Sequence, residues 1–233
     1  MNRIIILLGI AMVSLVATAQ QRKLHIPDWN NVEHIAATKP DSINRLVARL
    51  SQQKIDTTMT YDERVLAYCG MSYLAPGAPR NTQITDALKK EDYKTASSLA
   101  DSLLVRNPIH LQALWVKTVC CSQLSKQVTG EEAVGLLAKG QIYYNVMFRV
   151  LNTIASTGDG SREHPFYVTS VRDEYLFLRE YLEIYEVTGQ SIVQGPPVCD
   201  MLQLGKTSKY YDKKDIYFEI SRILEIEEQA YGK

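Results

Sequence analysis

Two apolar helices joined by an Asn-Pro turn in the middle of the chain constrain the fold more than any other feature of the sequence. In residues 93–104, alanine and leucine recur at three- and four-residue spacing and form one apolar helix face, which Asn107-Pro108 then ends. Residues 110–124 carry a second such face directly afterwards. Because each face must be buried against a neighbouring helix, the sequence predicts an array of antiparallel helical hairpins.

This step resembles part of a tetratricopeptide repeat array. Ala96 matches the small residue in the second helix of a repeat, Pro108 follows the core residues of that helix, and Leu114-Trp115 lies in the first helix of the next repeat. The glycine that the pattern expects in that next helix falls near Thr118, so the chain departs from the pattern there. The resemblance covers about 35 residues and implies a tetratricopeptide-like helical front half.

Helical periodicity and capping signals extend the array in both directions. We expect helices at residues 29–37 and 41–50, and a third that opens with a capping box of Thr60 and Glu63. A long helix is expected from a second capping box at Thr129 and Glu132 to about Ser156. The face of this long helix that should pack against the earlier helices consists of Leu137, Tyr144, Met147, Phe148, Leu151 and Ile154.

After Gly158 the pattern changes to short β-type runs that alternate with helices. Strands are expected at residues 166–170, 190–193, 198–204 and 215–220, with helices that begin at Ser170 and at Ser221. The sequence therefore predicts an α+β fold that is mostly α. Antiparallel helical hairpins fill residues 20–157, and a small antiparallel sheet with two helices fills residues 158–233, packed with the first region as one unit.

The C-terminal motifs resemble a second family. They are GDGS at residues 158–161, PFYV at 165–168, SVRDEYLFL at 170–178 and IYFEI at 216–220. In these motifs, and in the helix that precedes Asn107-Pro108, the chain is similar to the family catalogued as domain of unknown function 4919. That family consists of exported bacterial proteins. The resemblance implies a helical front half joined to an α+β back half, and it brings no activity, substrate or catalytic residue with it.

The first 19 residues have the pattern of a secretory signal peptide. Asn2-Arg3 is followed by an apolar run and by the small-residue cleavage site Ala17-Thr18-Ala19. The apolar run has about 13 residues, whereas a membrane span needs about 20, so an uncleaved anchor is the weaker alternative. The sequence predicts a periplasmic or extracellular protein that has no membrane span once residues 1–19 are removed.

Charge and cysteine content exclude several classes of protein. The 26 basic and 26 acidic residues balance, and no basic run occurs, which argues against a nucleic-acid partner. The four cysteines lack metal-site spacing, and no cofactor motif is present, so we expect neither a metal nor a cofactor. Small buried thiols are the simplest expectation, and the alternative is one disulfide between Cys69 and either Cys120 or Cys121.

One polar loop offers candidate catalytic chemistry. Asp159 and His164 lie in the loop of residues 158–164, and Asp173 and Glu174 open the following helix. Asp159, His164 and Glu174 together could supply an acid and a base if they met in a cleft. The simpler alternative is that the glycines and Asp159 form a turn, while Asp173 and Glu174 favour the helix N-terminus.

Aromatic residues provide the candidates for binding. The chain has 14 tyrosines but only four phenylalanines and two tryptophans, and tyrosine suits both half-exposed core edges and binding surfaces. The candidate binding residues are Trp115, Tyr143, Tyr144 and Tyr175. The preferred hypothesis is a non-catalytic protein-interaction or binding module of the bacterial envelope, with another envelope protein or a glycan as partner. The alternative is an enzyme with its site at the Asp159–His164 loop and Asp173/Glu174.

Overall fold

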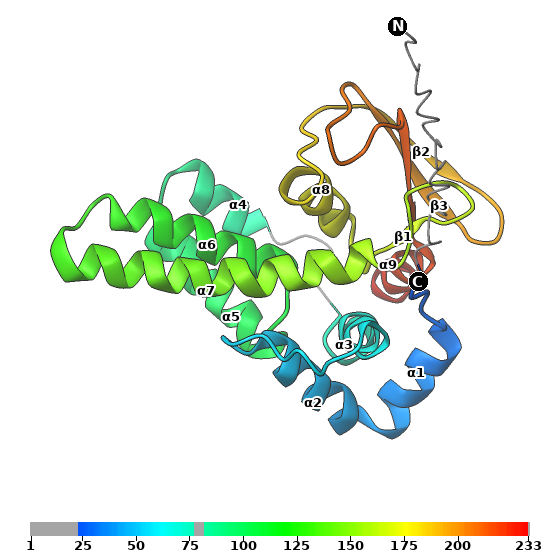
Figure 1. Cartoon of the computed structure of the whole chain (residues 1–233), viewed down its shortest axis with the longest axis horizontal. Helices are drawn as coiled ribbons and strands as arrows, with labels where there is room; N and C mark the ends of the chain where they lie inside the picture. The colour runs from blue at the N-terminus through cyan, green and yellow to red at the C-terminus, as the bar shows by residue number, and fades with distance from the viewer. Residues whose placement is uncertain (1–22, 77–81, 233) are drawn as a thin grey trace, which may run out of the picture.

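The computed structural model describes residues 23–76 and 82–232 (Figure 1), so the predicted signal peptide lies outside the described residues. The helices are α1 (Trp29–Thr38), α2 (Pro40–Ser51), α3 (Tyr61–Leu74), α4 (Thr82–Lys89), α5 (Tyr93–Arg106), α6 (Leu111–Ser125), α7 (Gly130–Ala155), α8 (Val171–Glu180) and α9 (Ser221–Tyr231). The strands are β1 (Phe166–Tyr167), β2 (Val187–Val193), β3 (Cys199–Leu204) and β4 (Asp215–Glu219). The predicted fold class, α+β and mostly α, is confirmed.

The first three helices begin where the sequence predicts. The capping box of α3 is present, because Thr60 Oγ1 accepts from the Glu63 N–H while Glu63 Oε2 accepts from the Thr60 N–H. Pro40 occupies the first turn of α2, where its missing N–H costs no helical hydrogen bond. Among the described residues, none of the helices is both long and apolar enough to cross a membrane.

A short helix that the sequence analysis missed, α4, lies against α5 and α6. These three helices enclose what we call the small core. It consists of Ile84, Ala87, Ala96, Ala100, Ala113, Val116 and Cys120. Asp92 caps α5 by accepting from the Thr95 N–H, and His110 caps α6 by accepting from the Ala113 N–H. The chain turns back between the two helices at Asn107-Pro108, as predicted.

The long helix α7 is present, but two predictions about it are wrong in part. The Thr129 side chain makes no capping hydrogen bond, although the helix does begin after it. Only half of the predicted apolar face is buried, namely Met147, Leu151 and Ile154. Leu137, Tyr144 and Phe148 are 53%, 39% and 38% exposed. The reason is spatial, because α6 and α7 project together as an arm, and α2 and α3 lie against the later part of α7 (Figure 1).

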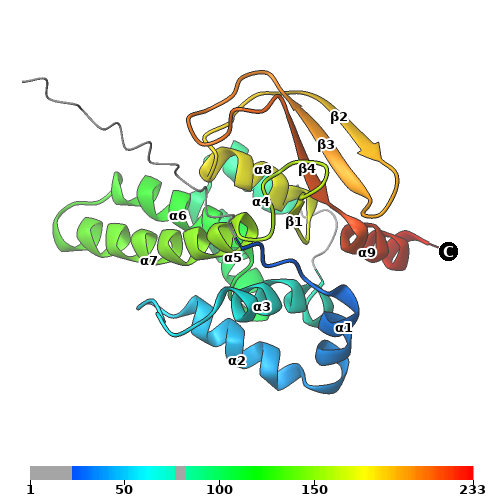
Figure 2. The same cartoon turned by 45° about the vertical axis from the view of Figure 1, so that its right-hand side comes forward.

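The sheet has the order β1-β4-β3-β2, with α8 on one of its faces (Figure 2). The pairs β2–β3 and β3–β4 are antiparallel, as predicted. Strand β1 instead pairs parallel to β4, with Phe166 opposite Phe218, so the whole sheet is mixed rather than antiparallel. A parallel pair needs a long connection between its strands, and here the connection contains α8, β2 and β3.

The main core joins the helical half to the sheet. Buried side chains from α1, α2, α3, α6, α7, α8, α9 and all strands except β2 belong to this one cluster, which runs from Val32 to Ile223 in the sequence. At its centre, Phe177 of α8 lies 4.7 Å from the Phe166 ring and 6.1 Å from the Phe218 ring. All four cysteines are buried free thiols, and Cys69 belongs to the main core whereas Cys120 belongs to the small core. The alternative disulfide between α3 and α6 is therefore not formed.

Candidate functional site

Helix α8 has two chemically different faces. Asp173, Glu174, Leu176, Phe177 and Leu178 are buried, which places two carboxyl groups on the inner side of the helix. The outer side carries Val171, Arg172, Tyr175 and Arg179 at three- and four-residue spacing. Ser170 fixes the start of the helix, since its hydroxyl accepts from the Asp173 N–H. The helix thus holds both arginines toward its exposed face.

An open cavity of about 280 Å³ lies between the outer face of α8 and helix α6. Two of the candidate binding residues meet there, Trp115 from α6 and Tyr175 from α8. The other lining residues are Gln112, Val171, Arg172, Leu176 and Arg179. The lining therefore combines aromatic rings, an amide and two guanidinium groups, and it contains no carboxylate.

Specific contacts fix the side chains of this cavity. The Arg179 guanidinium lies 4.6 Å from the Trp115 ring centroid, within the range of a cation–π contact, and its Nε donates to Glu180 Oε1 at 2.8 Å. The Tyr175 hydroxyl donates to Gln190 Oε1 of β2 at 2.9 Å. Because each polar end is held, the ring of Tyr175 and the plane of Arg179 are oriented in advance of any ligand.

A second, more enclosed cavity of about 140 Å³ adjoins the first and shares Gln112, Val171 and Arg172 with it. We call the two together the α6–α8 groove. Its inner end is polar at Asp173, whose Oδ2 accepts from the Tyr68 hydroxyl at 2.7 Å and from Thr169 Oγ1 at 3.2 Å. Much of the remaining wall is apolar, and Glu227 of α9 adds a second carboxylate, with Ser72 and Asn107 as further polar residues. The apolar residues are Met71, Ala75, Leu103, Ile109, Leu111, Ile223 and Ile226.

Burial changes the titration of the polar groups at the inner end. It raises the pKa of Asp173, although the hydrogen bond from Tyr68 opposes this shift. Burial lowers the pKa of His110, which lines the same cavity, while the nearby Asp173 carboxyl opposes that change. His110 Nδ1 accepts from the Ala113 N–H at 3.3 Å, so a neutral His110 carries its proton on Nε2. The inner end therefore offers a histidine and a carboxyl group in one cavity.

Glu174 lies on the opposite side of α8 and does not reach the groove. It is fully buried, and the surrounding protein raises its pKa well above the usual range, mainly through burial and secondly through the neighbouring Asp200 carboxyl of β3. Asp200 accepts a hydrogen bond from Gln190 Nε2, while burial raises its pKa as well. The two carboxyl groups therefore form a buried pair, and the pKa of each is raised.

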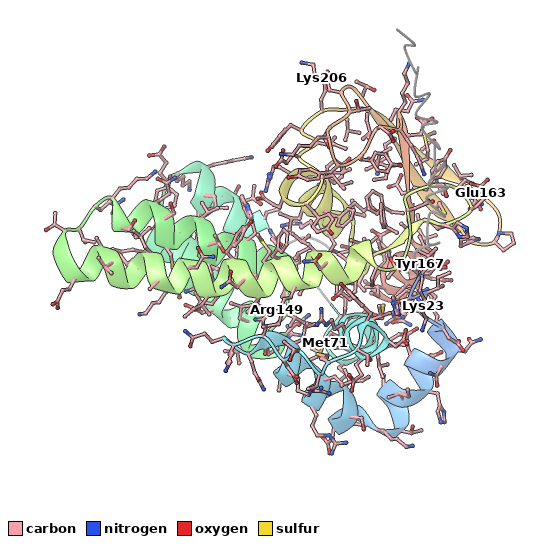
Figure 3. The ribbon with its side chains drawn as sticks, in the orientation of Figure 1. Lys23, Met71, Arg149, Glu163, Tyr167 and Lys206 are labelled. Atoms are coloured by element: carbon pink, nitrogen blue, oxygen red, sulfur yellow. The ribbon has the colours of Figure 1, made fainter. Side chains whose placement is uncertain are left out.

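The predicted catalytic loop has the geometry of a turn. Asp159 Oδ1 accepts from the Ser161 N–H at 2.8 Å, and Lys213 Nζ lies 3.4 Å from the same oxygen. Burial raises the pKa of Asp159, but the hydrogen bonds from Ser161 and the charge of Lys213 outweigh this and lower the pKa overall. Gly160 adopts a φ of 77°, which glycine reaches without strain. Figure 3 shows Glu163 of this loop at the rim of the sheet, away from the α6–α7 arm.

The candidate residues are thus divided among four places. Asp159 and His164 lie in the loop, and the carbonyl of His164 accepts from the Asp159 N–H, whereas Glu174 points into the core. None of the three lines the α6–α8 groove. Tyr143 and Tyr144 lie on α7, where Tyr144 stacks on Phe148 and Tyr143 faces Lys117, and they do not line the groove either. Trp115 and Tyr175 are the two candidates that the fold brings together.

The sequence analysis missed Arg172, Arg179, His110 and Tyr68 as site residues. A signal was present for the arginines, because Arg172 and Arg179 lie two turns apart with Tyr175 between them and so share a helix face. No sequence signal joins Tyr68 or His110 to Asp173, since these contacts arise only from tertiary packing. Across residues 23–76 and 82–232, no group of three or more His, Cys, Asp or Glu side chains is placed to hold a metal ion.

Taken together, the fold defines an α+β protein whose helical half and small mixed sheet share one core, with a groove between helices from the two halves. Residues 41–229 match the family described as a domain of unknown function, DUF4919, and the chain belongs to that family. Searches of curated proteins and of solved structures found no match.

Proposed function

We propose that the protein is a non-catalytic binding module of the bacterial envelope and that its ligand occupies the α6–α8 groove. One observation carries the proposal: Trp115 and Tyr175, from two separate helices, line one open cavity with two arginines. Tryptophan, tyrosine and arginine are the side chains that most often dominate binding energy. The signal-peptide pattern of residues 1–19 supports export as part of the same proposal.

The helical half supplies one wall of this groove. The turn at Asn107-Pro108 sets α6 directly after α5, and the small core holds the two helices together. The antiparallel arrangement of α5 and α6 supports a tetratricopeptide-like character for the helical half, and we include this character in the proposal. In that arrangement His110 is the N-cap of α6, and the first two turns of the helix carry Gln112 and Trp115 toward the groove.

Capture of partners from the envelope fraction tests the binding proposal. The wild-type protein is compared with Trp115→Ala, and with Tyr144→Ala as a matched loss of an aromatic ring outside the groove. We expect the wild type and Tyr144→Ala to retain the same partner, and Trp115→Ala to lose most of it. Equal retention by all three proteins would show that the groove is not the binding site. Cell fractionation with and without residues 1–19 tests export separately.

The second candidate function is that of an enzyme, and one observation supports it. Asp173 and His110 line one enclosed cavity, and burial shifts the pKa of each. The original enzymatic hypothesis used Asp173 and Glu174 with the Asp159–His164 loop, whereas this version uses Asp173 with His110. An activity found in the wild type and lost in both Asp173→Asn and His110→Gln, with Asp159→Asn unaffected, would favour it over the binding module.

A further inference from the structure

Arg149 of α7 carries a buried positive charge and a buried donor without an acceptor. The residue is only 8% exposed, and Figure 3 shows it on the side of α7 that faces α2 and α3. Its Nη2 donates to the carbonyl oxygen of Gln52 at the end of α2, whereas its Nε has no acceptor among the described residues. One donor of this guanidinium is therefore engaged with the protein, and another is available to a further group.

A second arginine, Arg64, lies near Arg149. It belongs to the start of α3, a helix that packs on α7, and its guanidinium carbon lies 5.0 Å from the ring centroid of Tyr61. The Nε of Arg64 is likewise buried and has no acceptor among the described residues. The pKa of Arg149 is lowered, mainly by burial and secondly by the charge of Arg64. Two like charges therefore lie close together where α3 packs against α7.

The carboxylates of this region are engaged with a different arginine. Arg49 of α2 donates from Nε to Asp56 Oδ2 and from Nη1 to Glu63 Oε1, each at 2.8 Å. The second oxygen of Glu63 serves the capping box at the start of α3. Across the part of the chain that the structure describes, no carboxylate forms an ion pair with Arg64 or Arg149. The charge of these two arginines is therefore not compensated by the protein itself.

A buried arginine pair of this kind is costly for the folded state. A buried N–H group that lacks an acceptor keeps the full cost of its lost hydration, and two like charges repel more strongly inside a protein than in water. A water molecule would supply an acceptor but would leave both charges uncompensated. An anion supplies an acceptor and also reduces the repulsion, so the arrangement favours an anion over water.

The burial of both Nε atoms favours an anion that is small and singly charged. The cost of transferring an ion from water into a protein rises with the square of its charge, so a phosphate dianion is taken up at a greater cost than a monovalent ion. An organic acid would also need space for its carbon skeleton in a closely packed interior. A halide ion has no preferred direction of approach, which suits donors that come from two different helices.

We propose that Arg64 and Arg149 bind a small monovalent inorganic anion of the chloride class, which bridges α3 and α7. Neither arginine lines the α6–α8 groove, so this site is separate from the proposed binding function and goes beyond it. Because the two arginines come together only when α3 packs on α7, the anion binds the folded state and stabilises that packing.

Thermal melting of the full protein in two salts tests the inference. Sodium gluconate, whose anion is too large for a buried site, is replaced stepwise by sodium chloride at constant ionic strength. Each tenfold increase in chloride above its dissociation constant should raise the Tm by about 3–5 °C, because the ligand binds only the folded state. A Tm that stays the same as chloride replaces gluconate would overturn the inference.

Variants then assign the chloride effect to the arginine pair. Arg149→Met removes the buried charge and keeps an unbranched apolar side chain, so it should lose the dependence of the Tm on chloride. Arg45→Gln on α2 removes an exposed arginine and should keep that dependence. Arg64→Gln is the second variant, and it serves as the test if Arg149→Met does not fold. Equal chloride dependence in the wild type and in a folded variant at either position contradicts the assignment.

Bromide locates the ion directly, since it replaces chloride and gives an anomalous X-ray signal. Crystals grown in sodium bromide should show an anomalous peak within hydrogen-bonding distance of the guanidinium groups of both Arg64 and Arg149. If no such peak lies between them, water serves the two donors and the inference is wrong. Sodium sulfate is the last salt in the melting series. A sulfate effect that exceeds the chloride effect and is lost in Arg149→Met would identify the ligand as an oxyanion and reject a halide.

Discussion

The main core and the small core of this protein are filled by different kinds of side chain. The main core is built around large residues such as Phe177 and Phe218, and it draws on segments from Val32 to Ile223. The small core draws on a single stretch, from Ile84 to Cys120, and four of its seven buried members are alanines. The main core is therefore stabilised by the apolar area that large side chains from distant segments bury. The small core is stabilised by the close approach of neighbouring helices.

This difference teaches how each core should respond to substitution. Removing a large side chain from the main core leaves a cavity that the surrounding strands and helices cannot fill completely. The alanines of the small core have little side chain to lose, and that core is sensitive to added volume instead. The two cores should thus fail under opposite changes.

The largest expected effect is truncation in the main core. Phe177→Ala should lower the free energy of unfolding by about 3–5 kcal/mol, because Phe177 is fully buried and lies against the rings of Phe166, Tyr181 and Phe218. Urea denaturation measures the change. Phe148→Ala removes the same atoms from the 38% exposed ring on α7 and should cost much less. Similar losses from the two variants would contradict the described packing.

A pH series tests the buried acid pair where the main core meets the sheet. The pKa of Glu174 is raised well above its usual value by burial and by Asp200, so the folded state binds this proton more tightly than the unfolded state. Its stabilisation is fully present below the ordinary glutamate pKa of about 4.3 and is lost as the pH rises through the folded-state value. The contribution of Glu174 to the free energy of unfolding should therefore decrease as the pH rises from about 4.3 through the folded-state pKa.

Glu174→Gln should flatten that decrease, because the amide stays neutral at every pH. Asp173 and Asp200 also have raised pKa values, so part of the slope should persist. Thermal melting from pH 4 to pH 9 compares the variant with Glu163→Gln, which changes an exposed loop residue. Parallel curves for wild type and Glu174→Gln would show that Glu174 does not hold the proton.

The smallest of the three effects is overpacking of the small core. Ala100→Leu should destabilise the protein by about 1–3 kcal/mol, since Ala100 is fully buried among α4, α5 and α6. Val105→Leu, on the same helix at 84% exposure, is the control and should change stability by about 0.5 kcal/mol or less. A neutral or stabilising Ala100→Leu would mean that the small core contains unfilled space.

The same contrast explains which parts of the molecule could be predicted from sequence. The α5–α6 step could be predicted because its helix face, its caps and its Asn107-Pro108 turn are all local in the chain. The short helix α4 was missed, and the exposure of Leu137 and Phe148 on α7 was not foreseen. Periodicity gives a helix its apolar face but does not say how much of that face its neighbours will cover.

The candidate site was also predictable only in part. Trp115 and Tyr175 could be selected from the sequence by residue type, but the sequence could not show that they lie in one cavity, because this depends on how α6 packs beside α8. The contact of Tyr68 with Asp173 joins residues 105 positions apart, and the pair of Glu174 with Asp200 depends on β3 lying against α8. Local rules predicted Asp173 and Glu174 as favourable residues at a helix N-terminus, and they could not predict that both would be buried.

The parallel pairing of β1 with β4 has a consequence for how this protein can diversify. Residues 168–214 follow β1 directly, form α8, β2 and β3, and end at Asp215, where β4 begins on the strand directly beside β1. The segment is therefore an insert with adjacent ends, and it carries α8 with the arginines and the tyrosine of the groove. Relatives could exchange the outer residues of this insert, and with them the ligand, while the helical scaffold and the strand pair that anchors the insert stay the same.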